Sequence, residues 1–387
     1  MRGYLLRGFR LGSAGNPESW RFVRELFWIA FVLAAYTYVG YPLWLKVLAV
    51  LRPRTVRRSS ITPSISIVIA LHNEERSLGS KLDNIARLKY PSPIEVVLVS
   101  DGSTDGTNAI LSSAPGFVHP ILLPKAEGKA EALNAGVSAA TGEILVFFDA
   151  RQIVAEDALL ELTSFFFDDT VGATSGELVL EDAAGAPKVG IYWRIEKLIR
   201  RLESESGSVA GVTGAIYAMR RELFVPLPKG TILDDLLIPM NVIRAGKRVV
   251  FCSTAVAHDR IFPEPGKEFS RRVRTLTGNY QLFKIAPWLL TPVNPILFRF
   301  ISHKVLRLAV PLLLAVLLVS AALAPGAFYK AALGVQLIFY GLAALGWLSP
   351  PTRKFRLVAT AETFTMLNVA AIFAFYNFAT GREKVWV

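Results

Sequence analysis

Apolar residues are spread unevenly along the 387-residue chain. Long uncharged runs lie near both ends, whereas short apolar runs alternate with amphipathic stretches in between. The short runs have the length of buried strands, and the alternation predicts an α/β fold with a mostly parallel sheet. We expect strands at 64–71, 95–100, 117–123, 144–149, 172–180, 215–219 and 247–253, and helices at 74–88, 105–113, 127–139, 190–206 and 234–245.

The long uncharged runs are long enough to cross a bilayer. They lie at 27–45, 308–329, 331–348 and 357–380, and the last contains one carboxylate, Glu362, near its start. Residues 265–303 are basic, aromatic and interrupted by prolines, which is typical of the membrane interface. The pattern divides the chain into a basic N-terminal segment (1–25), a transmembrane helix (26–51), a cytoplasmic domain (62–264), interfacial amphipathic helices (265–303) and three transmembrane helices (304–387).

Basic residues suggest how these segments are oriented. Four arginines follow the first span and three positive charges lie in 350–356, which under the positive-inside rule puts the 62–264 domain in the cytoplasm. The arginines of 1–25 favour the opposite orientation of the N-terminus. We therefore expect a multi-pass protein of the cell inner (plasma) membrane.

The formal net charge is +12, from 43 lysines and arginines against 31 acids. Anionic lipids and an anionic substrate such as a sugar diphosphate both fit this excess. Nucleic acid is disfavoured, because basic residues and aromatic residues that could read bases are not combined on one helix or stripe. The lone cysteine, Cys252, excludes an intrachain disulfide and is compatible with a reducing cytosol.

Polar residues follow several predicted strands. Asp149 ends the apolar strand 144–149, and a carboxylate there favours a metal or nucleotide role, since buried acids are rarely left unpaired. Asp101 begins a loop with two glycines and can accept hydrogen bonds from a ribose or base, although ordinary turn chemistry is the alternative. Lys129 opens a helix, where it could meet a phosphate or lie at the surface.

Further candidates lie in the second half of the domain. Asp234 and Asp235 stand at a predicted helix start, so they are either a helix cap or a base that takes a proton from an attacking hydroxyl. His258, expected just after a strand, is a metal ligand, a phosphate contact or a structural residue. Three arginines form either a membrane-facing basic face or a clamp on a leaving diphosphate: Arg271, Arg272 and Arg274.

In this order and spacing, the motifs resemble those of the family 2 glycosyltransferases, in particular the membrane-bound, cellulose-synthase-like branch. The resemblance covers about 62–283. It rests on the Asn73-Glu74-Glu75 start, the Asp-Gly-Ser-x-Asp-Gly-Thr signature with Asp101 and Asp105, the Gly-Lys-x-x-x-Leu-Asn element with Lys129 and Asn134, Asp149 as first acid of Asp-x-Asp, the Gly214–Arg221 acceptor loop, and Asp234-Asp235 in place of Glu-Asp.

The resemblance implies a GT-A (Rossmann-like) catalytic domain and an inverting hexosyltransferase. Asp235 would be the general base with Asp234 in support, and a Mg²⁺ or Mn²⁺ ion would be held by Asp149 and His258. The implied substrate contacts are His72, Glu74, Asp101, Asp105, Lys129, Asn134, Arg151, Gly214, Arg271, Arg272 and Arg274.

The chain departs from the family pattern at two places. Arg151 replaces the second acid of Asp-x-Asp, which leaves the metal one carboxylate fewer, and Arg151 could itself contact phosphate. Processive synthases carry Gln-x-x-Arg-Trp on an interface helix, whereas this chain has Arg271-Arg-Val-Arg274-Thr275. The tryptophan that lines the acceptor site in those synthases is therefore replaced by Thr275, which raises the question of processivity.

Three functions remain open. The first is transfer of a sugar from a UDP- or GDP-sugar to a polysaccharide or lipid-linked glycan, with membrane lipids and a homo-oligomer or secretion partner as further partners. The second is transfer to polyprenyl phosphate. The third is a nucleotide-sensing transporter or scaffold, which is disfavoured because the spans lack polar clusters apart from Glu362.

Overall fold

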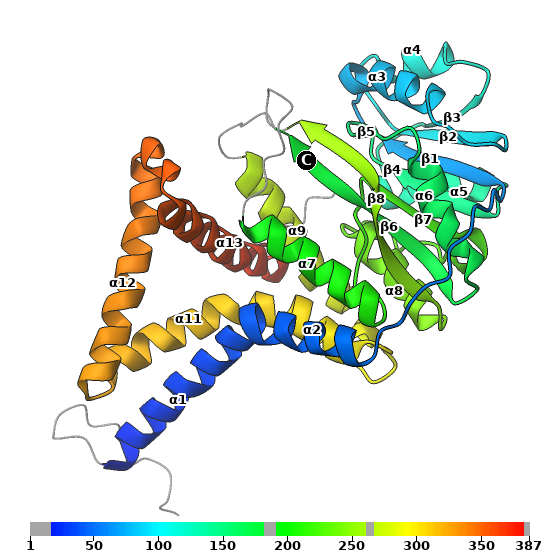
Figure 1. Cartoon of the computed structure of the whole chain (residues 1–387). Coiled ribbons are helices and arrows are strands. Elements are labelled where there is room, and N and C mark those ends of the chain that lie inside the picture. The colour runs from blue at the N-terminus through cyan, green and yellow to red at the C-terminus, as the bar shows by residue number, and fades with distance from the viewer. Residues whose placement is uncertain (1–16, 182–190, 261–266, 383–387) are drawn as a thin grey trace, which may run out of the picture. The chain divides into compact units, whose positions relative to one another are not determined.

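The computed structural model describes residues 17–181, 191–260 and 267–382, which form two compact units (Figure 1). The described parts of Gly40–Val305 and Ala370–Val387 form the α/β unit, and those of Met1–Val39 and Leu306–Val369 form the helical unit. Each unit is described below by itself.

The α/β unit is built on one sheet, which has eight strands within the described residues, in the order β3-β2-β1-β4-β7-β6-β8-β5. Strands β1 to β4 pair in parallel, β7 runs antiparallel to its neighbours β4 and β6, β8 is parallel to β6, and β5 is antiparallel to β8. The strands are β1 (Ile65–Leu71), β2 (Ile94–Asp101), β3 (Val118–Leu123), β4 (Ile144–Phe148), β5 (Ile153–Val154), β6 (Val171–Glu181), β7 (Ile216–Arg220) and β8 (Arg248–Arg260).

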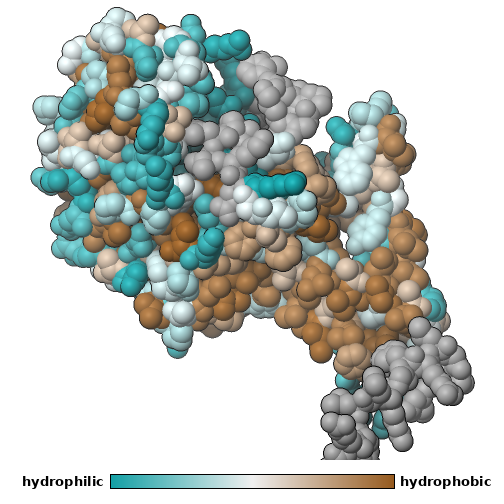
Figure 2. All heavy atoms as spheres, turned by 180° about the vertical axis from the view of Figure 1, so that it is seen from behind, coloured by the Kyte–Doolittle hydropathy of each residue, from teal (hydrophilic) through white to brown (hydrophobic). Residues whose placement is uncertain are grey.

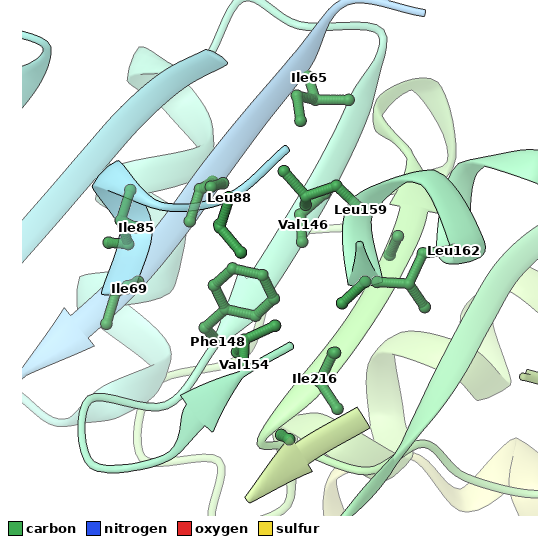
Figure 3. Close-up of a cluster of buried hydrophobic side chains, with 14 of the residues drawn as sticks. Ile65, Ile69, Ile85, Leu88, Val146, Phe148, Val154, Leu159, Leu162 and Ile216 are labelled. Atoms are coloured by element: carbon green, nitrogen blue, oxygen red, sulfur yellow. The ribbon is translucent and has the colours of Figure 1, made fainter. Parts of the chain in front are cut away.

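Crossover helices connect the parallel strands and cover the sheet. These are α3 (Glu75–Ala86), α4 (Thr107–Ser112) and α5 (Lys129–Ala139). One face buries an apolar cluster that includes Phe148 of β4 and Leu159 and Leu162 of α6 (Ala158–Thr163); in Figure 3, Ile69 of β1 lies beside Ile85 of α3. Full burial of each such side chain is worth about 1.5–3 kcal/mol. The central strands are therefore buried on both faces, and their polar ends lie at one edge.

The α/β unit also contains the helices α2 (Tyr41–Leu51), α7 (Ile191–Ser206), α8 (Asp234–Arg244), α9 (Lys267–Ile285) and α10 (Leu297–Phe300). Short helical turns complete it: η2 (Ser164–Phe167), η3 (Arg221–Leu223), η4 (Pro287–Leu290) and the π-helix η5 (Ile301–Val305). Another π-helix, η1 (Tyr36–Gly40), leads from α1 to α2.

A buried polar network ties α2, α7 and η5 together. The Glu203 carboxylate is fully buried and accepts a hydrogen bond from the Tyr41 hydroxyl at 2.5 Å, and it lies 2.9 Å from His303 Nδ1. The Arg299 guanidinium donates to the main-chain oxygen of Glu203 at 2.8 Å. Because each charge has polar partners, the network fixes η5 against α7.

The helical unit contains α1 (Pro17–Ala35), α11 (Leu306–Leu323), α12 (Ala327–Leu348), η6 (Pro350–Lys354) and the first part of α13 (Arg356–Ala379). Four helical stretches of the described chain are long and apolar enough to cross a membrane: Trp20–Leu51, Leu297–Leu323, Ala327–Leu348 and Arg356–Ala379. Apolar side chains gather on the surface of the helices, whereas the α/β part is mostly hydrophilic (Figure 2).

The expected fold class is confirmed, and the structure corrects several boundaries. The predicted span 308–329 is wrong because α11 ends at Leu323 and α12 begins at Ala327, after a turn in which Gly326 has φ of +119°. Helix α6 and strand β5 were not expected. His258 lies inside β8, paired with Ile153 of β5, rather than after the strand. The domain boundaries stay a prediction.

Candidate active site

Asp101, the last residue of β2, fixes the loop that leads into α5. Its two carboxylate oxygens accept hydrogen bonds from the main-chain N–H groups of Glu127 and Gly128, each at 2.8 Å. The next residue, Gly102, has φ of +54°, and a Cβ there would come within 2.2 Å of the Ala126 nitrogen. Only glycine allows this close approach. Asp101 thereby determines where Lys129 begins its helix.

The loops after β1 and β2 are hydrogen-bonded to each other. His72 Nδ1 lies 2.7 Å from the main-chain oxygen of Asp101. The Asp105 carboxylate accepts from the N–H groups of Glu75 at 3.1 Å and Thr107 at 3.0 Å. The Thr107 hydroxyl in turn accepts from the N–H of Glu74 at 2.8 Å. The predicted nucleotide contacts His72, Glu74, Asp101 and Asp105 are thus brought together at one edge of the sheet.

Lys129 bridges two carboxylates from distant parts of the chain. Its Nζ lies 3.1 Å from Asp149 Oδ1, directly after β4, and 3.2 Å from Asp234 Oδ2, at the start of α8. Burial alone would lower the pKa of Lys129, but the nearby carboxylates outweigh burial and raise it above the usual value. Burial acts in the opposite direction on Asp149, and Lys129 overcomes it to lower the pKa of that acid. The ammonium and Asp149 are both charged at neutral pH.

Asp235 faces the same space as Asp149. A Cβ built on Gly214 would lie 3.5 Å from Asp235 Oδ2 and 3.8 Å from Asp149 Oδ2. Burial and the adjacent Asp234 raise the pKa of Asp235 to about 6, although Lys129 and Lys304 oppose the rise. An acid poised near neutral pH beside a small open position is suited to accept a proton from a substrate.

The site has room for a cation on the Asp149 side. Asp149 is 38% exposed, and while its Oδ1 contacts Lys129, its Oδ2 faces the Gly214 position. Among the described residues, the buried Asp234 Oδ2 makes no hydrogen bond beyond its ion pair with Lys129 at 3.2 Å. Within the same residues, no cluster of three or more His, Cys, Asp or Glu side chains could hold a metal. A divalent ion would fit here only with diphosphate oxygens and waters as further ligands.

His258 and Arg151 lie in a second polar group. His258 Nδ1 is 2.6 Å from Glu181 Oε1, on neighbouring strands β8 and β6. An Arg151 guanidinium nitrogen lies 3.6 Å from Asp259 Oδ2, which also accepts from Gln152 Nε2 at 2.9 Å. Glu181, rather than Asp149, is the recorded partner of His258, so its metal-binding role stays a prediction.

The remaining predicted contacts lie in structural pairs. The Asn134 side chain donates to the main-chain oxygen of Leu227 at 2.9 Å and accepts from its N–H at 2.8 Å, which anchors the segment before α8. On α9, which also carries Arg271 and Arg274, the Arg272 Nε lies 2.7 Å from Glu268 Oε1. The substrate roles of Asn134 and the α9 arginines stay predictions.

Three basic residues around the site were missed from the sequence. Lys81 of α3 is fully buried and donates to the main-chain oxygen of Gln152; burial lowers its pKa to about 8, and Asp149 opposes the shift. Arg200 of α7 donates to the Thr213 hydroxyl at 2.5 Å. Lys304 of η5 places Nζ 3.9 Å from where a Cβ on Gly211 would stand. The sequence offered a signal only for Lys81, which lies on the apolar side of the predicted helix at 78–85. Arg200 and Lys304 reach the site through tertiary contacts that no local pattern indicates.

A sheet edge with a lysine-bound acid, beside a helix start bearing a second acid of raised pKa, is suited to group transfer on a fold of the GT-A type. Comparison with known proteins gives the particular family, since residues 66–226 match the family described as Glycosyl transferase family 2. Residues 66–226 are thus the part of the chain that matches a family 2 glycosyltransferase domain, in agreement with the family predicted from the sequence.

Individual relatives agree with this assignment. The poly-beta-1,6-N-acetyl-D-glucosamine synthase of Staphylococcus aureus (strain COL) is 24% identical over 228 residues, which is 56% of this chain and 55% of the relative. The probable glycosyltransferase YdaM of Bacillus subtilis (strain 168) is 26% identical over 234 residues, again 56% and 55%. The chain thus spans about half the length of the curated relatives it matches.

A solved structure extends the similarity beyond this domain. The mannosyltransferase PcManGT from Pyrobaculum calidifontis, in complex with GDP-Man and Mn²⁺, is 26% identical. It aligns with a TM-score of 0.70 over 92% of this chain and 100% of the solved chain. The GT-A fold class is therefore supported by both sequence and structure.

Proposed function

We propose that the protein is an inverting membrane glycosyltransferase that moves a sugar from a nucleotide diphosphate sugar to a hydroxyl of a polysaccharide or lipid-linked glycan. One observation carries the proposal. Asp235, an acid with its pKa raised to about 6, and Asp149, the predicted donor-side acid, face the same position beside Gly214. A base and a diphosphate site that face the same position beside a small residue suit a direct displacement at a sugar carbon.

The donor would lie along the edge formed by β1, β2 and β4. His72 and Asp101 line the nucleoside side, and Lys129 lies next to Asp149 on the diphosphate side. A bound Mg²⁺ or Mn²⁺ would supply charge neutralisation for the diphosphate, with Asp149 as its ligand from this chain. The Mn²⁺ in the PcManGT complex supports this choice of cofactor.

The transfer would be a single step. Asp235 takes the proton of the acceptor hydroxyl while that oxygen forms a bond to the anomeric carbon. The bond from this carbon to the donor phosphate breaks, the nucleoside diphosphate leaves with the electron pair, and the configuration at carbon inverts. Lys129 would counter the charge that develops on the leaving diphosphate, and Arg151 or the α9 arginines would add to it.

The helices suggest where the reaction takes place. Four helical stretches have the length and hydropathy of membrane spans, and the arginines after the first span favour a cytoplasmic catalytic domain. We infer a multi-pass protein of the inner (plasma) membrane, where nucleotide sugars are available on the cytoplasmic side. A membrane setting fits an acceptor that is lipid-linked or is a growing polysaccharide.

A panel of nucleotide sugars tests the proposal. The purified full chain is incubated with UDP-GlcNAc, UDP-glucose, GDP-mannose and related donors, with membrane lipid extract as acceptor, and released nucleoside diphosphate is measured. We expect one donor to be turned over with Mn²⁺ or Mg²⁺ and to lose most of its turnover in excess chelator. Full activity in chelator would refute the metal role of Asp149, and no turnover of any donor would refute the function.

A further inference from the structure

A pocket of about 170 Å³ lies beside the proposed active site, within the α/β unit. The second half of β6, the first turns of α7 and one residue of β8 form its walls, which include Leu178, Leu180, Trp193 and Phe251. Since one water needs about 10–15 Å³ measured in this way, the space takes on the order of a dozen non-hydrogen atoms. A single hexose ring with its hydroxyl groups has this size.

The pocket is connected to the catalytic loop through two hydrogen bonds. Arg200, on the pocket wall, donates to the hydroxyl of Thr213 at 2.5 Å. The N–H of Thr213 donates to Ser175 Oγ at 2.9 Å, and Ser175 precedes the pocket on β6. Thr213 is adjacent to Gly214, which faces Asp149 and Asp235. The pocket is therefore linked, through Arg200 and Thr213, to the position where the acceptor hydroxyl is needed.

The polar atoms of the pocket favour a neutral, hydroxyl-bearing occupant. Glu177 Oε1 pairs with Lys197 Nζ at 2.5 Å, whereas its buried Oε2 has no hydrogen-bond partner among the described residues. A buried carboxylate oxygen without a donor calls for one, and hydroxyl groups are donors. An anion would instead be repelled by the same oxygen. The lining also contains Arg194, Lys197 and Arg200, of which Lys197 is paired with Glu177 and Arg200 with Thr213. The acceptor oxygen without a donor therefore favours a hydroxyl group at Glu177.

Trp193, in the first turn of α7, adds an apolar surface to the pocket. The Arg272 guanidinium carbon lies 5.5 Å from the centre of the Trp193 ring, so the wall of the pocket adjoins the arginine stretch of α9. In that stretch Thr275 stands where processive synthases have a tryptophan. An aromatic face packs well on the C–H face of a sugar ring, and here that face comes from α7 instead of α9.

We propose that this pocket binds one hexose ring of the acceptor glycan, with Trp193 against the ring and Glu177 accepting a hydrogen bond from one of its hydroxyl groups. The assignment rests on the proposed glycosyl transfer and names the part of the acceptor that the enzyme recognises. Mono-glycosides should therefore bind in the absence of any donor. Loss of Trp193 should weaken the acceptor without weakening the nucleotide sugar.

The test uses methyl glycosides of glucose, mannose and N-acetylglucosamine as probes. Binding to the full chain in detergent is measured by saturation-transfer NMR titration. Trp193→Leu is compared with Trp288→Leu, a matched control on η4 outside the pocket, whose ring also carries an arginine, Arg244, at 4.9 Å. We expect at least one glycoside to bind, a Kd about tenfold higher for Trp193→Leu, and an unchanged Kd for Trp288→Leu.

Glu177→Gln provides a second variant, because it keeps the shape and removes the charge. We expect it to weaken the same glycoside several-fold, and all variants to bind the nucleotide sugar as the parent protein does. Absence of glycoside binding, equal weakening by both tryptophan variants, or binding of inorganic phosphate or a short polyprenyl phosphate instead would overturn the assignment. The binding measurements need no turnover, so they test the pocket assignment independently of the transfer reaction. A negative result in the donor panel would instead refute the transfer reaction.

Discussion

Two groups of acids in the proposed site differ in the partners that their carboxylates have. Asp101 accepts two main-chain N–H bonds, each 2.8 Å long, and Asp105 likewise receives main-chain donors. Asp149, Asp234 and Asp235 gather around Lys129, and burial and Asp234 raise the pKa of Asp235 to about 6.

The difference separates acids that build the site from the acid proposed to act in it. A carboxylate saturated by backbone N–H groups is fixed and contributes to stability, since such charge-assisted bonds are worth about 1.5–3 kcal/mol each. A carboxylate whose ionised form is disfavoured lowers the stability of the folded protein and gains affinity for protons. Aspartate therefore stabilises the folded protein at one end of the site and destabilises it at the other.

The largest expected effect comes from replacing one acid of each kind by its amide. Asp235→Asn removes the proposed base and a disfavoured charge, so we expect transfer to fall by at least about 1,000-fold and the free energy of unfolding at pH 7 to rise by on the order of 2 kcal/mol. Asp101→Asn puts an amide NH₂ where a main-chain N–H needs an acceptor, so stability should fall by about 2 kcal/mol. Transfer assays and thermal unfolding measure both.

Nucleotide-sugar binding by Asp235→Asn serves as the control and should equal that of the parent protein. If Asp235→Asn retained full transfer, Asp235 would not be the base. If both amide variants lowered stability alike, the contrast between the two groups of acids would be lost.

The first half of the sheet was predictable because its signals are local. Continuous apolar runs predicted β1, β2 and β4 to within a residue or two, and the acids that follow β2 and β4 were predicted as site residues. The Asp101 interpretation, however, left turn chemistry and nucleoside contact open, and the structure shows that turn contacts fill both oxygens of its carboxylate. A sequence indicates where an acid lies but not which main-chain donors reach it.

The second half was harder because its contacts are distant in sequence. Lys304 was not singled out in the sequence, yet its ammonium lies 3.9 Å from where a Cβ on Gly211 would stand, near the main-chain oxygen of Asp235 in α8. Arg200 reaches Thr213 only because α7 packs beside β6 and β8. His258, expected as a metal ligand, is paired with Glu181 across two strands whose register no local pattern specifies.

A pH profile examines the group around Asp235 next. Because the raised pKa of Asp235 is about 6 and the base must be ionised, kcat/KM should be flat above pH 7 and fall about tenfold for each unit below 6. The sign for stability is opposite: protonation relieves the disfavoured charge, so the stability gap between Asp235→Asn and the parent should narrow as the pH falls through 6. A flat profile between pH 5 and 7 would contradict both expectations.

The smallest effect on activity should come from substitutions of Lys304. They test whether its charge acts on Asp235 over a distance, without direct contact. Its Nζ and the main-chain oxygen of Asp235 lie within 4 Å of the same point beside Gly211, and its charge lowers the pKa of Asp235. Lys304→Met removes that charge, so the midpoint of the acidic limb should move up by about half a pH unit with little change in the plateau. Lys304→Arg keeps the charge and should leave the midpoint in place.

The paired lysine variants distinguish electrostatics from packing. Lys304 follows His303, which the buried Glu203 holds in η5, so a purely structural role would lower the plateau and leave the midpoint unchanged. A midpoint that shifts with methionine and returns with arginine would show that the charge of Lys304 in η5 lowers the pKa of the proposed base. The acids around Lys129 would then depend on a cation from η5, whereas Asp101 and Asp105 are satisfied within their own loops.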